Sequence, residues 1–514
     1  MYPGTFAAIT PGKPAVIMGG SREVITYREL NERSARLAQL LFARGLRPGD
    51  KIAFLAENHP RYYEVYWAAM RSGLYLTAVN RYLAPAEAAY LVNDSGATVC
   101  ITTAQLAPTA VPMLELIGDC PIRLMMDGVA DGFESYEAAL DASSSEPLTN
   151  QPRGQVMLYS SGTTGRPKGV ERPLRGLQID DPSAATMAST LRTLLGMTER
   201  SVYLCPAPLY HAAGLVWSSG THELGGTVVV MEKFDAEQFL ALVERESVTH
   251  TQVVPTMLVR LMKLAPEVRG RYDLSSLECV VHAAAPCPIE VKHQVIKWLG
   301  SIVHEYFAAT EGNGMTFISA TDWLAHPGSV GRPMFGIPHV CDEDGREVPL
   351  GEPGLIYFEQ EHPSFEYHGD PEKTRASRHP EHDNWSALGD IGYVDADGYI
   401  YLTDRRAFTI ISGGVNIYPA EIESCLIMHP SVSDIAVFGL ADPEMGEYVH
   451  AVVQPADGVE GSPELAEELL GYAREHLARY KVPRVINFRA ELPRLPTGKL
   501  YKQGLRDEYR KARA

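Results

Sequence analysis

A stretch of small, polar and basic residues at positions 159–170 has the composition of a phosphate-binding loop. It reads YSSGTTGRPKGV and follows the apolar segment 155–158. Hydroxyl and backbone N–H groups of such a loop can surround phosphate oxygens, and a lysine adds positive charge. The pattern differs from the phosphotransferase loop GxxxxGKS or GxxxxGKT, because Lys168 lies three residues after Gly165 and precedes Gly169. By composition alone, a plain surface loop is an equal alternative. The candidate phosphate ligands are Ser160, Ser161, Gly162, Thr163, Thr164, Gly165 and Lys168.

Seven further segments carry the glycine, acidic and basic residues that a nucleotide site requires. Together with the loop at 159–170 they resemble, in order, the motifs of the adenylate-forming superfamily. That superfamily includes acyl- and aryl-CoA synthetases, the adenylation domains of nonribosomal peptide synthetases, and firefly luciferase. Each match alone is weak, but their ordered occurrence over nearly the whole chain is specific. The segments are PLYHAAG at 208–214, HAAAP at 282–286, FAATEG at 307–312, LGDIG at 388–392, DRR at 404–406, ISGGVNIYPAEIE at 411–423 and PRLPTGKL at 493–500.

The resemblance implies that ATP binds together with Mg²⁺. The loop at 160–168 would hold the β- and γ-phosphates, and Thr310 would contact the α-phosphate or lie beside it. Glu311 and Thr164 would ligate Mg²⁺, a hard cation that takes carboxylate, hydroxyl and phosphate oxygens. Outside this family context, Glu311 would be an ordinary solvated glutamate.

The nucleoside of ATP has its own set of residues in the same resemblance. Asp390 would accept hydrogen bonds from the ribose hydroxyls, and Arg405 would contact the same ribose. Phe307 stands where the family usually has a tyrosine that stacks on adenine, and the neighbouring Tyr306 is an alternative stacking residue. The residues expected around the base are Ala284, Ala285, Pro286, Phe307 and Ala308.

Two half-reactions are implied, and each uses a different part of the C-terminal region. Lys499 would stabilise the negative charge that develops as the substrate carboxylate attacks the α-phosphate. After a rotation about a hinge at 404–406, Gly413 and Gly414 would let the backbone approach the arm of CoA. The hinge position that usually carries Asp or Lys is Ala407 here, so charge interactions that would favour one orientation are absent.

An apolar acid is the expected substrate. The resemblance places the acyl pocket along 210–217, 253–256, 283–284 and 307–310, with His211 over the carboxylate end. The small residues in these segments indicate room for an elongated or bulky acid. We therefore expect an ATP-dependent acyl-CoA synthetase acting on a fatty acid, with aryl-alkanoic or steroid side-chain acids as close seconds. The same motifs also fit transfer of the acyl group to a carrier protein, and a non-catalytic nucleotide or acyl binder on the same fold.

The elements that must position these residues alternate between strands and helices. Helical spacing at 28–45 and 60–73 surrounds a short apolar strand at 51–55, and the same order recurs from 226 to 282. Alternation of this kind favours parallel sheets with crossover helices, as one large α/β body or two packed sheets. Near residue 390 a hairpin pattern begins, and about 110 residues with the pattern of a small α+β domain follow. Helices are expected there at 419–428 and 463–478, and strands at 435–438 and 449–453.

We thus predict a large N-terminal domain of stacked α/β sheets and a small mobile α+β C-terminal domain. The predicted bounds are 1–403 for the AMP- and acyl-binding domain, 404–406 for the hinge and 407–514 for the mobile domain.

The overall composition limits the partners. The chain has 514 residues, and 46 basic against 64 acidic residues give a net charge of −18, which argues against nucleic acid and anionic membrane surfaces. Seven scattered cysteines without a CxxC pair indicate reduced thiols, so we expect a cytoplasmic protein without an integral membrane segment, and a homodimer is one expected assembly. The sequence HPEHD at 379–383 resembles a metal cluster, but its proline and polar surroundings favour a surface loop. No GxSxG elbow of a serine hydrolase occurs.

Overall fold

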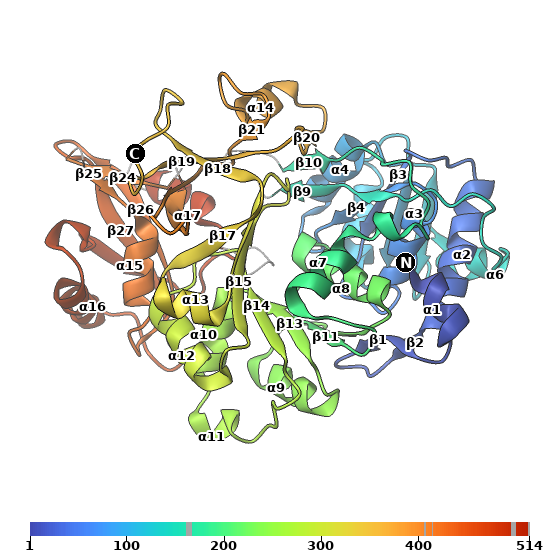
Figure 1. Cartoon of the computed structure of the whole chain (residues 1–514), viewed down its shortest axis with the longest axis horizontal. Helices are drawn as coiled ribbons and strands as arrows, with labels where there is room; N and C mark the ends of the chain where they lie inside the picture. Colours follow the sequence, from blue (N-terminus) through green and yellow to red (C-terminus); the bar gives the residue numbers. More distant parts are fainter. Residues whose placement is uncertain (161–166, 406–407, 414, 495–499, 512–514) are drawn as a thin grey trace.

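The chain forms a large mixed α/β domain and a separate smaller C-terminal domain, which confirms the predicted fold class (Figure 1). The structure is a computed structural model that describes residues 1–160, 167–405, 408–413, 415–494 and 500–511. Among the helices of these segments, none is long and apolar enough to cross a membrane.

The first sheet of the large domain is parallel and carries the predicted alternation of strands and helices. The capping box between Thr26 and Glu29 fixes the start of α2, which covers the helical pattern expected at 28–45. The strand order is β7-β6-β5-β3-β4-β8. The bounds are β3 (Lys51–Leu55), β4 (Tyr75–Val79), β5 (Val99–Thr103), β6 (Ile122–Met126), β7 (Glu134–Ser135), β8 (Gln155–Val156), α2 (Tyr27–Ala43), α3 (Tyr62–Met70), α4 (Pro85–Ser95), α5 (Ala107–Met113) and α6 (Tyr136–Asp141).

The second sheet is larger and changes character along its width. Its strands from β1 through β12, β11, β13 and β14 to β15 pair parallel, whereas β2 pairs antiparallel with β1 and the strands from β15 onward pair antiparallel. The strands expected between 226 and 282 are all present. The bounds are β1 (Pro14–Met18), β2 (Val24–Thr26), β11 (Val202–Cys205), β12 (Thr227–Val230), β13 (His250–Val253), β14 (Cys279–His282), β15 (Val303–Ala308), β16 (Met315–Ile318), β17 (Ser329–Phe335), β18 (Ile337–Cys341), β19 (Gly354–Glu359), β22 (Asp390–Val394) and β23 (Ile400–Arg405).

Helices α3 and α8 (Ala212–Leu224) connect the two sheets through one apolar core. Every residue of α3 is buried, and one cluster joins Phe54 of the first sheet and Tyr203 of the second with Trp67 and Trp217 of these helices. Burial of this extent makes the two sheets one packed body. The carboxyl ends of the parallel strands then share an edge, where ligands of such sheets usually bind. The helices beside the second sheet are α9 (Ala236–Arg245), α10 (Pro255–Lys263) and α12 (Ile289–Leu299).

A small three-stranded sheet places the ends of the predicted phosphate loop. Strand β9 (Leu158–Ser160) pairs antiparallel with β10 (Lys168–Glu171), with Ser160 opposite Lys168, and β10 pairs with β20 (Glu366–Tyr367). The stretch 159–170 therefore joins two paired strands. Residues 161–166 lie outside the described residues.

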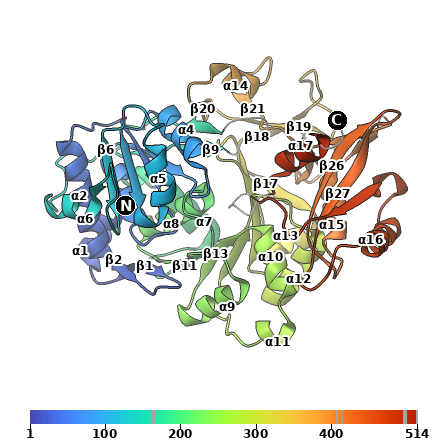
Figure 2. The ribbon, with the colours of Figure 1, turned by 180° about the vertical axis from the view of Figure 1, so that it is seen from behind.

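The C-terminal domain has a sheet of its own and lies beside α12 and β17 of the large domain in Figures 1 and 2. Its predicted helices at 419–428 and 463–478 are confirmed, whereas β26 and β27 form a hairpin much longer than the predicted strands at 435–438 and 449–453. The predicted hinge overlaps the end of β23, and the predicted domain bounds stay a prediction. The bounds of the elements are β24 (Ile410–Ser412), β25 (Val415–Ile417), α15 (Pro419–Leu426), β26 (Val432–Asp442), β27 (Gly446–Pro455), α16 (Pro463–His476), β28 (Val485–Phe488) and α17 (Lys502–Lys511).

Candidate active site

A single large cavity of about 2180 Å³ lies between the two domains. It opens where the loops after β13, β14 and β15 meet, and both domains contribute to its wall. Its size exceeds that of a typical small-molecule pocket, so it has room for more than one ligand. Of the residues predicted for the site, those that line it are His211, Ala284, Ala285, Pro286, Phe307, Ala308, Thr310, Glu311 and Asp390.

Glu311 lines one end of this cavity, where hydrogen bonds fix the neighbouring groups. Glu311 is only 7% exposed, and the phenol of Tyr367 donates a hydrogen bond to its Oε1 at 2.9 Å. Arg172 donates from Nη2 to the backbone carbonyl of Thr310 at 2.7 Å. The negative charge of the Glu311 carboxylate stabilises the positive charge of this guanidinium. Glu311 is therefore a buried carboxylate with a fixed orientation, and not the ordinary solvated glutamate that it would be outside the family context.

One lysine, Lys373, lies near this carboxylate, and a second, Lys168, lies near Lys373. The ammonium of Lys168 pairs with Oδ2 of Asp370 at 2.8 Å, and this hydrogen bond raises the pKa of Lys168 and lowers the pKa of Asp370. Lys373 is the third residue of the helix α14 (Pro371–Ala376), and its ammonium lies 5.1 Å from the ring centre of Tyr367. Burial and then the charge of Lys168 lower the pKa of Lys373. Cations that repel one another at one place favour a bound polyanion.

The loop predicted to lie around adenine contains strained backbone. Ala284 has a φ of +77°, in the left-handed region that favours glycine, and it is exposed to the cavity just after β14. Such strain in a residue other than glycine is concentrated at functional sites. Ala285 and Pro286 continue the cavity wall, so the backbone of this loop is accessible to a ligand.

Tyr306 and Phe307 point to opposite sides of β15, as successive residues of a strand must. The ring of Tyr306 stacks on Trp217 with 5.6 Å between centres, whereas Phe307 packs near Phe358 with 6.4 Å between centres. Burial raises the pKa of Tyr306 to about 12. The structure therefore favours Phe307 over Tyr306 as the residue available to the base.

The predicted ribose contacts stand on neighbouring strands. Asp390 begins β22, has 9% exposure and lines the cavity. It lies directly opposite Arg405 in the register of β22 and β23. The backbone of Arg405 is thus beside the backbone of Asp390, while the side chain of Arg405 lies outside the described part of the residue.

The acyl side of the cavity runs between α7 (Thr186–Leu195) and α8. Trp217 of α8, stacked between Tyr203 and Tyr306, forms an aromatic wall, and His211 precedes the first turn of α8. Sequence reasoning found α8 through the PLYHAAG motif but missed α7, which belongs to no motif. The apolar residues of α7 on the cavity are Met187, Leu191, Leu194 and Leu195.

The C-terminal domain presents both of its predicted motifs to the cavity, the motif at 411–423 through its second half, from Tyr418 to Glu423. Arg494 and Leu500, which bracket the segment with Lys499, form an antiparallel bridge and line the cavity. Lys499 itself lies outside the described residues. In contrast, Gly413 is exposed in the turn between β24 and β25, with a φ of +58°, and does not line the cavity. Gly414 is not among the described residues, and neither are Ser161, Gly162, Thr163, Thr164 and Gly165.

Known families match this sequence over both domains. The profile of the AMP-binding enzyme family matches residues 5–368, and that of the AMP-binding enzyme C-terminal domain matches residues 421–499. The chain belongs to this family. It is thus an enzyme of the adenylate-forming superfamily, among the AMP-forming acid–thiol ligases.

Curated relatives and solved structures resemble this AMP-binding enzyme along its full length. A feruloyl-CoA synthase of an Amycolatopsis species is 35% identical and covers 99% of this chain and 98% of its own. The fatty acid–acyl-carrier-protein ligase ScoC of Streptomyces coeruleorubidus is 32% identical, covering 97% and 94%. The structure of the o-succinylbenzoate CoA synthetase MenE of Bacillus subtilis with its acyl-adenylate intermediate has a TM-score of 0.79 at 27% identity, covering 98% and 97%.

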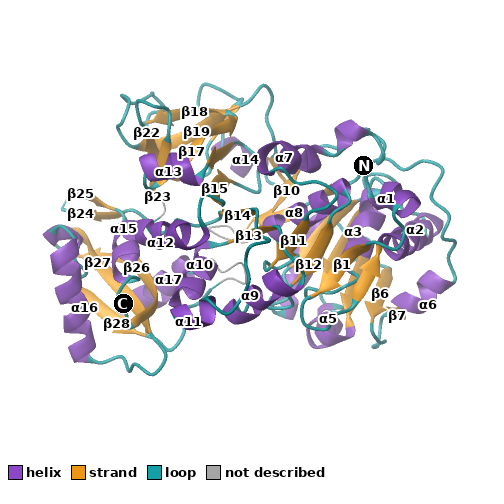
Figure 3. Cartoon of the chain, turned by 60° about the horizontal axis from the view of Figure 1, so that its bottom comes forward, coloured by secondary structure: helices purple, strands orange, loops and turns teal. Residues whose placement is uncertain are grey.

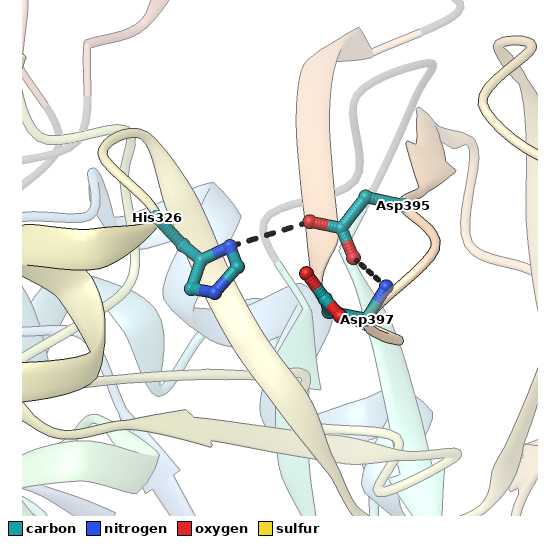
Figure 4. A group of neighbouring side chains, drawn as sticks. All are labelled: His326, Asp395 and Asp397. Atoms are coloured by element: carbon teal, nitrogen blue, oxygen red, sulfur yellow. Dashed lines mark hydrogen bonds and ion pairs between the residues drawn. The ribbon is translucent and has the colours of Figure 1, made fainter.

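Two clusters of histidine and acidic residues lie outside the cavity of this AMP-binding enzyme. His326, Asp395 and Asp397 meet beside the hairpin of β22 and β23 (Figure 4), but Asp395 uses Oδ1 to accept the backbone N–H groups of Asp397 and Tyr399 and Oδ2 to accept from Tyr401. This aspartate shapes the turn. The stretch 379–383 is predicted as a surface loop, yet its first residue, His379, is buried against Trp385 in an aromatic cluster. Among the described residues, 379–383 contributes to no group that could hold a metal.

Proposed function

We propose that this AMP-binding enzyme joins an apolar carboxylic acid to CoA in two steps, through an acyl-adenylate. The observation that carries the proposal is one cavity that contains a charged end with Glu311, Arg172 and Lys373 and an apolar end between α7 and α8. ATP and an acid can meet at the junction of these ends. The membership of the AMP-binding family and the ligase relatives support the same reaction.

In the first step, an oxygen of the substrate carboxylate forms a bond to the α-phosphorus of ATP. The bond from this phosphorus to the oxygen that bridges it to the β-phosphate breaks, and pyrophosphate leaves. Lys168, Lys373 and Arg172 reduce the repulsion between the two anions because they surround the phosphate end. Lys499 would stabilise the charge at the reacting phosphate from the C-terminal side.

Glu311 would hold Mg²⁺ with the phosphates. A carboxylate that is buried and fixed through one oxygen by Tyr367 suits a hard cation. The bound ion would neutralise phosphate charge. The predicted second ligand, Thr164, lies outside the described residues.

In the second step, the thiolate of CoA attacks the carbonyl carbon of the acyl-adenylate. The bond from this carbon to the phosphate oxygen breaks, AMP leaves, and the proton of the thiol passes to water. The exposed turn at Gly413 would have to reach the cavity, so the C-terminal domain would rotate about the hinge at 404–406.

A fatty acid is the proposed substrate class, and CoA is the proposed acceptor. The apolar wall of α7 and Trp217 supports an apolar acid, and the relative ScoC is named as a fatty acid ligase. ScoC is also named for an acyl carrier protein, and the feruloyl-CoA synthase for an aryl acid. A panel of acids scored for AMP release with and without CoA distinguishes these possibilities. AMP release that does not depend on CoA for any acid would contradict CoA as the acceptor.

The two-step scheme is tested with Lys499→Ala. We expect this variant to lose acyl-adenylate formation by about 100-fold or more, because one preorganised cation at the developing charge is removed. Thioester formation from preformed acyl-adenylate and CoA should be largely retained. Lys511→Ala, at the exposed end of α17, is the matched control. Equal loss in both half-reactions would contradict the role of Lys499.

A further inference from the structure

The end of helix α10 contacts the C-terminal domain through one lysine. Lys263, in the last turn of α10, donates from Nζ to the backbone carbonyl of Val432 at 2.5 Å and to that of Ser433 at 3.4 Å. Both carbonyls lie at the start of β26. A basic residue at a helix C-terminus commonly serves the last carbonyls of its own helix. Lys263 instead bridges the two domains.

The same strand connects this contact to the terminal lysine motif. Asp434 follows Ser433, and the negative charge of its carboxylate stabilises the positive charge of Lys263. The guanidinium of Arg494 pairs with both oxygens of Asp434, with 2.5 Å between Nη2 and Oδ1. Arg494 is the last residue before the segment that contains Lys499. A short path of polar contacts therefore leads from α10 to the base of that segment.

Apolar packing also contributes to this interface. Helix α15 lies beside α12 (Figure 3), and Met428, just after α15, packs against the apolar cluster that includes residues of α10 and α12. Apolar contact is non-directional and tolerates sliding, whereas a hydrogen bond requires a defined distance and angle. The lysine contacts are thus suited to fix the angle between the domains.

We propose that Lys263 is a positioning residue that holds the C-terminal domain in the orientation seen here, and so serves adenylate formation only. In this orientation Arg494 and Leu500 line the cavity and Gly413 faces solvent. The inference rests on the two-step function proposed above. Lys263 acts through the placement of the Lys499 segment and not by contact with the reacting atoms.

The test compares the two half-reactions of the full-length protein. Lys263→Met retains most of the length of the side chain and removes the N–H donors, and Lys263→Arg restores donors. We expect Lys263→Met to lower the rate of acyl-adenylate formation about tenfold, the usual effect of one lost hydrogen bond from a charged donor. The rate of thioester formation from preformed acyl-adenylate should stay within about twofold of wild type, and KM for ATP and acid should not rise. Lys263→Arg should recover most of the lost rate.

Lys297→Met is the matched control, because Lys297 is an exposed lysine in the last turn of the neighbouring helix α12. It should leave both half-reactions unchanged. Equal loss in both half-reactions, an unchanged adenylation rate, or failure of Lys263→Arg to recover would each overturn the inference. If the wild type forms the adenylate but no thioester with CoA, the proposed acceptor fails. The adenylation rate of Lys263→Met relative to wild type then still decides the role of Lys263.

Small-angle X-ray scattering provides a readout that does not depend on chemistry. The unliganded Lys263→Met protein should show a scattering profile displaced from that of the wild type, since fewer molecules keep the orientation seen here. Identical profiles would count against the inference.

Discussion

The two domains contribute to the cavity in different ways. On the side of the large domain, Glu311, Tyr367 and Arg172 come from three separate segments and are connected by hydrogen bonds within one packed body. On the other side, Arg494 is bound inside its own domain to Asp434, and Lys263 reaches across to that domain. The groups proposed to bind the nucleotide are thus fixed in the large domain, whereas Lys499 and Gly413, each proposed for only one half-reaction, are carried on the C-terminal domain.

The sharpest test of this difference is a residue of the fixed side that should act in both steps. AMP is part of the ligand in both half-reactions, so Asp390→Ala should slow both by about 10³-fold, as expected for the loss of two charge-assisted hydrogen bonds to ribose. Half-reaction rates measured separately check this result. Asp397→Ala, in the turn of the same hairpin and exposed, should have little effect. A loss confined to adenylation would contradict this expectation, because Asp390 would then act in only one half-reaction, like the groups on the C-terminal domain.

Acid should lower the stability of the large domain, because one buried histidine becomes protonated on unfolding. His222 of α8 is fully buried; its Nε2 lies 3.0 Å from the carbonyl of Ala15, and its Nδ1 accepts from Trp67. Burial lowers the pKa of His222 to about 4. Because the unfolded chain binds the proton more readily, the stabilisation is complete above the unfolded pKa of about 6.5 and is lost as pH falls towards 4.

The expected loss is about 3 kcal/mol of unfolding free energy between pH 7.5 and 4.5. Denaturant unfolding at a series of pH values measures it. His222→Gln has the same donor and acceptor but does not titrate, so this component should be absent, while His362→Gln at an exposed position should retain it. The same pH slope in wild type and His222→Gln would contradict the assignment.

The smallest effect concerns the strained loop of the fixed side. Ala284→Gly should leave stability unchanged or raise it by about 1 kcal/mol, because glycine accepts a φ of +77° without strain and this gain offsets its larger unfolded-state entropy. Ala285→Gly has no such strain to relieve and should destabilise by about 0.5–1 kcal/mol. Thermal unfolding of both variants gives the comparison. A lower stability of Ala284→Gly than of Ala285→Gly would show that the strain is not significant.

Local patterns in the sequence predicted much of the fold. The strand at 51–55 and the helix at 236–246 follow from apolar periodicity and capping, and they are present almost as predicted. The long hairpin of β26 and β27 was underestimated, because polar residues such as Ser433 and Asp434 continue the strand where local propensity would end it.

Motifs located the candidate site only in part. Glu311 and Asp390 were found because they belong to contiguous motifs, and both line the cavity. Tyr367, Lys373 and Asp370 were missed, since they reach the site through the pairing of β20 with β10, which joins segments about 200 residues apart. The net charge of −18 gave no indication of this charged end, because it describes the whole surface and not a local group.

Because both domains form the wall of the cavity, entry of the thiol substrate is linked to exposure of the acyl-adenylate to water. An acyl-adenylate is a mixed anhydride that water destroys, and neither domain alone encloses the space where it would form. The rotation proposed to admit the thiol would then also uncover the intermediate. Entry of the second substrate and exposure to hydrolysis would be one event, so the speed of thiol capture determines how much activated acid is wasted.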